Sequence, residues 1–216
     1  MALQVTGSAQ GLVASTAQKS GSPSAISVGW SNEQISSELL ARFSNLVQAG
    51  VVFSLNFPAA AFAAPSATAL GAFALFNPPN SGKNIHILDV QVAVTTWTLV
   101  TTTAVAIGMI FIPNQAPTST TSTGAVPASN LVGSGTPTVA KPYITGTTVG
   151  APVLANRIVA DFLLATAAGA GDLWAVDHVD GAVVIAPGSG IQIQGVSGTE
   201  ADVTGIVGIT WAELPA

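Results

Sequence analysis

The chain of 216 residues contains no cysteine and very few charged residues. Without cysteine it forms no disulfide and no thiolate metal site. Charged residues make up 7% of the chain, against about 25% in ordinary soluble domains. A surface so short of charge is poorly protected against association, which favours a subunit whose outside contacts neighbouring subunits. The alternative is a surface of threonine, serine and asparagine that stays soluble without charges.

Long apolar runs and clusters of basic residues are also missing. The charge-free stretch of residues 91–140 is interrupted by prolines and by a threonine/serine tract. A transmembrane helix needs about 20 consecutive apolar residues, so none is expected. The first residues lack a basic region and a compact apolar segment, so no signal peptide is expected either. The net charge is −5, with five lysines and arginines scattered along the chain. We therefore expect no membrane partner and no direct nucleic-acid partner.

The first fifty residues differ from the remainder of the chain. Residues 1 to about 30 are small and polar with weak alternation, which is typical of an arm. Ser31 and Gln34 have capping-box spacing, and Gly50 stands where a helix C-cap is expected. Apolar residues recur between them at helical intervals, at Ile35, Leu39, Phe43 and Leu46. This pattern predicts an N-terminal arm over residues 1–50, with one short helix at about 32–49. An extended arm segment is the alternative.

From residue 51 the pattern becomes that of a β-domain, which we expect to span 51–216. Alternation predicts strands at 51–57, 71–76, 84–97, 104–112, 139–144 and 154–164. In the third of these the parity changes, so that a bulge near Ile87 and Leu88 would bring both sets of apolar residues to the core. In the last, four residues are predicted to point inward, Leu154, Ile158, Phe162 and Leu164. Arg157 and Asp161 are predicted on its outer face.

The last stretch, residues 182–214, predicts a closing antiparallel hairpin. A Pro-Gly-Ser-Gly turn at 187–190 supplies the positive-φ positions of a short loop. Gln192 and Gln194 alternate with isoleucines and are predicted to be exposed. The terminal strand is predicted to face the core with Val203, Val207, Ile209 and Trp211. Counting about eight strands, we predict an all-β fold, an antiparallel β-sandwich of jelly-roll type.

Ionisable residues gather in one place, at Asp172, Asp177, His178 and Asp180. Carboxylates and an imidazole are suited to Ca²⁺ or another divalent ion, but the spacing matches neither an EF-hand nor a two-histidine zinc site. A solvated loop is the favoured interpretation, so we predict no metal site and no cofactor. Trp174, beside Asp172 and Asp177, is the one local candidate for binding a glycan.

Catalytic signatures are not found. The segment Asn80-Ser-Gly-Lys-Asn84 lacks the first glycine and the Ser/Thr of a P-loop and precedes a strand, so it is predicted to be a turn. His86 is a lone strand histidine, and a metal-binding cupin needs more histidines than the two present. No Gly-x-Ser-x-Gly elbow marks a nucleophile. We predict no catalytic residue and no enzyme; a metal-dependent enzyme is the weakest alternative.

Three stretches carry distinctive turns and strand ends. They are residues 37–54, residues 74–88 with an Asn-Pro…Ser-Gly-Lys-Asn turn before a long strand, and residues 182–213 with an Ala-Pro-Gly turn and a closing Trp-x-Glu strand. Together they resemble a group of tailed-bacteriophage virion structural proteins. The resemblance implies a non-enzymatic virion component, a capsid decoration (cement) protein. It carries over no catalytic residue.

The expected function is therefore a structural one. The protein would self-associate as a homo-oligomer, a trimer, and bind other virion proteins such as the major capsid protein. Its arm would reach a neighbouring subunit, and its place would be the virion, assembled in the host cytoplasm. The alternative is a tail- or fibre-associated β-sandwich module that binds a glycan or receptor.

Overall fold

The computed structural model describes residues 27–28, 34–35, 43–62, 69–70, 73–99, 103–113, 126–143, 146–147, 153–164, 167–196 and 203–216. The chain divides into two compact units, Met1–Ser44 and Asn45–Ala216. In the first, strand β1 (Ser27–Val28) pairs antiparallel with strand β2 (Gln34–Ile35). Within the described residues, no helix has the length and apolar character needed to cross a membrane.

Helix α2 spans Ser44–Gln48 and is shorter than the predicted helix. The prediction of a helix over 32–49 is wrong at Gln34 and Ile35, which form strand β2, and residues 32–33 and 36–42 lie outside the described part. Phe43 adopts a left-handed φ of 66°, which cannot belong to a right-handed helix, so the helix begins after it. The predicted C-cap is confirmed, since Gly50 has φ 70°. Its N–H donates to the Val47 carbonyl at 2.9 Å, the bond of a helix-ending motif.

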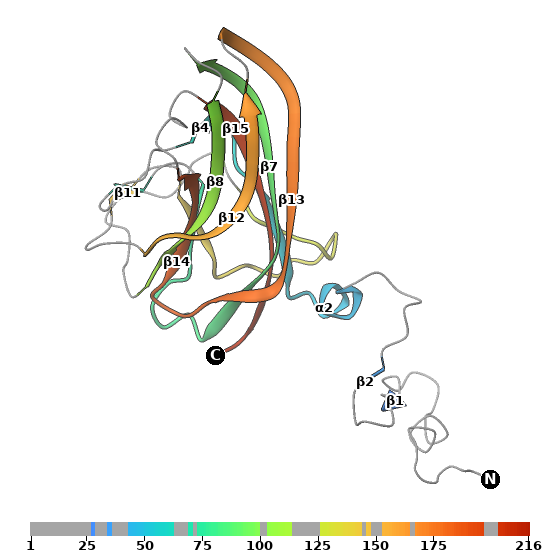
Figure 1. Cartoon of the computed structure of the whole chain (residues 1–216). Coiled ribbons are helices and arrows are strands. Elements are labelled where there is room, and N and C mark those ends of the chain that lie inside the picture. The colour runs from blue at the N-terminus through green and yellow to red at the C-terminus, as the bar shows by residue number, and fades with distance from the viewer. Residues whose placement is uncertain are drawn as a thin grey trace, which may run out of the picture. The chain divides into compact units, whose positions relative to one another are not determined.

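Apart from helix α2, the described elements of the second unit are antiparallel strands, most of them in two facing sheets, as predicted for a sandwich (Figure 1). The first sheet has the order β13-β7-β15-β3-β9, with β4 pairing β15. Its strands are β13 (Ala167–Ile185), β7 (Lys83–Leu99), β15 (Val203–Pro215), β3 (Val52–Asn56), β9 (Ala128–Ser129) and β4 (Ala60–Ala61). The second has the order β10-β6-β14-β8-β12. Its strands are β10 (Lys141–Tyr143), β6 (Ala74–Phe76), β14 (Gly190–Gly195), β8 (Thr103–Ile112) and β12 (Val153–Leu164). Strands β5 (Ala69–Leu70) and β11 (Gly146–Thr147) form a separate pair.

The hydrophobic core lies between these two sheets. The first sheet contributes Phe53 and Trp211, whose rings stack with centroids 6.1 Å apart. The second contributes Leu75, Met109 and Ile193, and all five side chains are at most 1% exposed. Full burial of each such side chain stabilises the fold by about 1.5–3 kcal/mol. The predicted core stripe of the terminal strand is confirmed, because Val203, Val207, Ile209 and Trp211 are all buried.

The bulge predicted near Ile87 and Leu88 in strand β7 is confirmed at Leu88. On the neighbouring strand β15, Thr210 pairs with Asp89 and Trp211 pairs with Ile87, so that Leu88 has no partner in that ladder. The extra residue changes the parity of β7. Ile87 and Leu88 are consequently both buried, at 0% and 3% exposure.

A second bulge, in β12, makes one prediction wrong. Ile158, predicted to face the core, is 53% exposed. It pairs with Gly108, whereas Ala160 pairs with the adjacent Ile107, so Val159 is an extra residue in the ladder. Val159 and Ala160 are buried instead. Leu164 is buried and Phe162 partly buried, as predicted. The side chain of Leu154 lies outside the described part.

The closing hairpin is not formed. Strand β13 belongs to the first sheet and β14 to the second, so the turn between them carries the chain across the sandwich. Gly188 has φ 86° there, as a tight turn requires. Strand β14 lies between β6 and β8, and Gln192 and Gln194 are 1% exposed, which makes their predicted exposure wrong. Alternation shows that a strand has two faces, but it does not show that the polar face stays uncovered.

Candidate functional site

The motifs on which the resemblance depends lie together at the crossings between the sheets. Asn77, after β6, is fully buried. Its Nδ2 donates to the carbonyls of Lys83 at 2.7 Å and Ile185 at 2.9 Å. Its backbone N–H donates to Ser189, and its carbonyl accepts from Gly188, each at 2.8 Å. One asparagine thus joins the Asn-Pro turn to the Ala-Pro-Gly turn.

The closing Trp-x-Glu strand is attached to the same region through Glu213. This carboxylate has 0% side-chain exposure and pairs with Lys83 Nζ at 3.2 Å. It also accepts from the backbone N–H of Val139 at 2.9 Å and from the hydroxyl of Thr138. Trp211 Nε1 donates to it at 3.3 Å. A buried carboxylate that accepts this many bonds fixes the segment before β10 against the end of β15.

The segment that resembles a P-loop is therefore a structural turn. Asn80 and Gly82 have φ of 62° and 70°, and Ser81 Oγ bonds the carbonyl of Lys83 at 3.1 Å. The lysine side chain is paired with Glu213. The predicted turn is confirmed, and its residues have a structural role.

The acidic cluster predicted from the sequence is divided between different roles. Asp177 receives two hydrogen bonds from Arg157, at 2.6 Å from Nε and 2.7 Å from Nη2. These bonds raise the pKa of Arg157 above its ordinary value, against the opposing effect of burial. Because Arg157 is on β12 and Asp177 on β13, the ion pair joins the edges of the two sheets.

Of the other members, Asp180 also contributes to the raised pKa of Arg157, whereas His178 contacts a residue of the neighbouring strand. His178 Nδ1 lies 2.5 Å from Asp89 Oδ1, across the ladder between β13 and β7. Asp180 is exposed and has φ 56°, and Gly181 follows with φ 81°, so this pair forms a bulge in β13. The Asp172 side chain lies outside the described part. In the side chains that the structure describes, no three of His, Cys, Asp and Glu gather as metal ligands. His86 is half-buried on β7.

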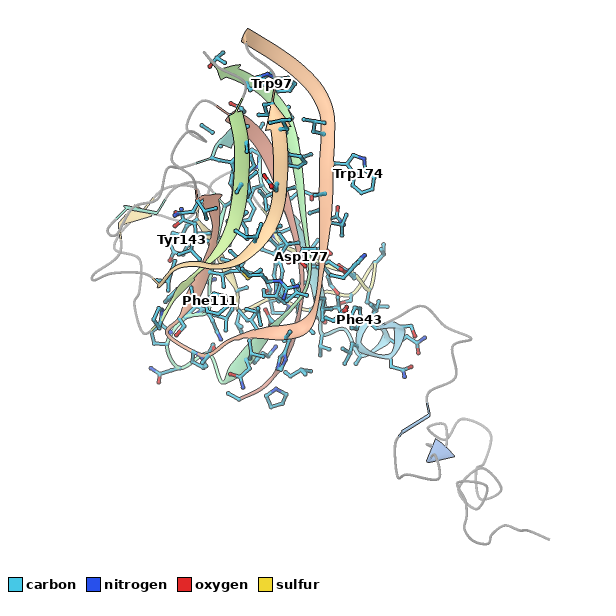
Figure 2. All side chains as sticks on the ribbon, in the orientation of Figure 1. Phe43, Trp97, Phe111, Tyr143, Trp174 and Asp177 are labelled. Atoms are coloured by element: carbon cyan, nitrogen blue, oxygen red, sulfur yellow. The ribbon has the colours of Figure 1, made fainter. Side chains whose placement is uncertain are left out.

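The outer face of the first sheet carries the most exposed tryptophan described. Trp174 is 71% exposed on the edge strand β13, and its side chain points away from the sandwich (Figure 2). It pairs with Ala93 of β7, which in turn pairs with Ile206 of β15. Ile206 is 38% exposed. These residues form one row across three strands, two positions along the strands from Gln91 and Gly208.

The residues of that second row line a hollow, and Gly208 forms its base. Gly208 pairs with Gln91 on one side and Asn56 on the other, and both amide side chains are exposed. A methyl group on Gly208 would lie 2.7 Å from Asn56 Oδ1, so the glycine leaves room for the amide above it. These three residues line a hollow of about 260 Å³ that reaches Trp174 and Ile206.

An adjoining hollow of about 160 Å³ shares the same three residues and continues to Ser54 and Thr210. The hydroxyls of Ser54 and Thr210 are 3.1 Å apart. The two hollows together, centred on Gly208 and running from Trp174 to Thr210, are called the Gly208 groove below. The sequence indicated Trp174 as a candidate for binding a glycan. Its neighbours in the groove come from β3, β7 and β15, which are far apart in the sequence, so no local sequence pattern predicts that they lie together.

Comparisons with known proteins do not identify the chain: no family model, no curated protein and no solved structure matches it. Functional assignment therefore depends on the geometry described above.

Proposed function

We propose that this chain is a non-enzymatic structural protein of a bacteriophage virion, a capsid decoration (cement) protein. Its body is a jelly roll that self-associates as a trimer and binds neighbouring capsid subunits. The N-terminal unit, Met1–Ser44, reaches a neighbouring subunit as an arm. Host cytoplasm is the site of assembly, and the virion is its final place.

The strand order supports the jelly-roll part of the proposal. Eight strands in chain order are β3, β6, β7, β8, β12, β13, β14 and β15. Numbered from one to eight, they run 6-3-8-1 in the first sheet and 2-7-4-5 in the second. Two interlocked Greek keys produce this order, and β9 and β10 are additions at the sheet edges.

The observation that carries the functional part is the convergence of the three motifs. The Asn-Pro turn, the Ala-Pro-Gly turn and the Trp-x-Glu strand meet through Asn77, Lys83 and Glu213. The residues on which the resemblance rests thus fix the crossings between the two sheets, and this common structural role supports the proposal. Assembly is the direct test of this role.

Exposed apolar side chains support the subunit role. Val132 is 96% exposed, Val126 79% and Leu163 74%. Together with a chain in which 7% of residues are charged, they favour contacts made by apolar burial with little electrostatic steering.

Native mass measurement and co-sedimentation with purified capsids test the proposal. We expect a trimer whose mass is unchanged up to about 1 M salt, where the Debye length falls to about 3 Å. We also expect the protein to sediment with capsids that lack it. A monomer at high concentration that binds neither capsids nor other virion proteins would overturn the proposal.

A further inference from the structure

The Gly208 groove has the chemistry of a small-molecule site. Binding sites combine an apolar surface with a few polar groups that fix the orientation of the ligand. Here Trp174 and Ile206 supply the apolar surface, and Asn56, Gln91 and Thr210 supply the polar groups. We propose that this groove binds a neutral carbohydrate. The proposal concerns a second activity and does not depend on attachment to a capsid.

Trp174 provides the stacking surface. Its indole is 71% exposed, although a tryptophan is costly to leave in water. The C–H face of a pyranose ring is apolar and slightly positive, and it packs against the negative face of an aromatic ring. A sugar stacked on Trp174 would cover indole surface and bring its hydroxyls toward Gln91, in the neighbouring row of the sheet.

The amides of Asn56 and Gln91 provide the hydrogen bonds. Each amide offers a carbonyl acceptor and an NH₂ donor, and a sugar hydroxyl is both donor and acceptor. Both side chains are exposed and stand on either side of Gly208. The Gly208 position, without a side chain, lets a ring approach the sheet between them. Amides, hydroxyls and apolar groups line the groove, which favours a neutral ligand over an acidic or basic one.

The dimensions favour a sugar over a protein partner. A stable protein interface buries about 800 Å² on each partner and centres on several apolar side chains. In the groove, the large exposed apolar side chains are Trp174 and Ile206, and the rest of its length is polar. Two adjoining hollows of about 260 and 160 Å³ are suited to two successive sugar units.

The test uses the full chain on an array of neutral oligosaccharides built from glucose, galactose and mannose, with sialylated sugars as the acidic comparison. The strongest neutral sugar is then titrated calorimetrically. Trp174→Ala should weaken its binding by about tenfold or more, the usual effect of removing an aromatic anchor. Gly208→Ala should weaken it similarly, because the added methyl displaces the Asn56 amide.

Leu163→Ala is the matched control, because Leu163 is 74% exposed but lies on β12 of the other sheet. Its binding should equal that of the wild type. The proposal is overturned if no neutral sugar binds the folded protein, if sialylated sugars bind better, or if Trp174→Ala leaves binding unchanged. It is also overturned if Trp174→Ala changes the native mass while sugar binding is absent, which would make the face an interface between copies. Capsid co-sedimentation of the same variants separates this result from the virion role.

Discussion

Two glycines of strand β15 have different space around them, and this difference predicts different responses to alanine. At Gly205 a methyl group would clash with the backbone carbonyl oxygen of Ala93 and lie 2.6 Å from the ring of Phe62. Phe62 is buried and the carbonyl belongs to the adjacent strand, so neither has room to move. We expect Gly205→Ala to lower the free energy of unfolding by about 3 kcal/mol. Urea denaturation followed by tryptophan fluorescence measures this loss.

Gly208→Ala is the internal comparison. Its nearest atom is Oδ1 of Asn56 at 2.7 Å, the end of an exposed side chain that can rotate away. The change in unfolding free energy should stay within about 1 kcal/mol. Equal losses for the two variants would contradict this prediction. They would show that alanine is equally unfavourable at both glycine positions and that the different surroundings have no effect.

Individual side chains were predictable where alternation alone decides burial. The stripe from Val203 to Trp211 is an example, because that strand faces the core without interruption. The prediction that Ile158 faces the core was wrong because the extra residue Val159 reverses the parity of the strand. No residue type in that segment indicates a bulge. The predicted exposure of Gln192 and Gln194 was wrong because β14 is a central strand and its second face is also covered.

At the level of strands and turns, Glu213 is the side chain that we expect to matter most for stability. It holds Thr138 and Val139 against β15 while it is fully removed from solvent. Glu213→Gln keeps the shape but replaces one accepting oxygen with a donor that faces other donors. We expect a loss of about 2–4 kcal/mol in the free energy of unfolding. Chemical denaturation of both proteins measures it.

Lys83→Met serves as the control for charge pairing alone. Lys83 has 33% side-chain exposure, so its pairing with Glu213 is partly screened by water. The carboxylate would keep its backbone and hydroxyl donors in this variant, and the loss should be smaller than in Glu213→Gln. If Lys83→Met were the more damaging change, the ion pair and not the hydrogen bonds would hold this segment.

The elements themselves were largely predictable. Strands β3, β7, β8 and β12 fall where alternation places them, and the parity change at Leu88 located a bulge correctly. The helix was not predictable in length, because its start is set by the left-handed backbone of Phe43. A phenylalanine at helical spacing gives no sign of that conformation.

For the whole molecule, the sequence predicted an antiparallel sandwich but misplaced one connection. The turn at 187–190 reads as a hairpin turn, yet it joins different sheets. Asn77 lies 108 residues before Ile185 and binds its carbonyl just ahead of this turn, a contact that no local pattern predicts. The Gly208 groove likewise could not be predicted from the sequence alone. Trp174 stands out in the sequence, but Asn56, Gln91 and Gly208 come together only through the strand order β7-β15-β3.

The division of the chain into two units gives the last prediction. Residues Asn45–Ala216 form a compact unit of their own, with both sheets and the core between them. A protein of residues 43–216, which keeps Phe43 and helix α2, should therefore fold and melt within a few degrees of the full chain. Under the proposed role it should also bind capsids less, because the arm that reaches a neighbouring subunit is gone. Thermal melting by circular dichroism and capsid co-sedimentation measure the two effects separately. A shortened protein that folds and binds capsids as tightly as the full chain would contradict the function of the arm, and one that fails to fold would contradict the independence of the sandwich.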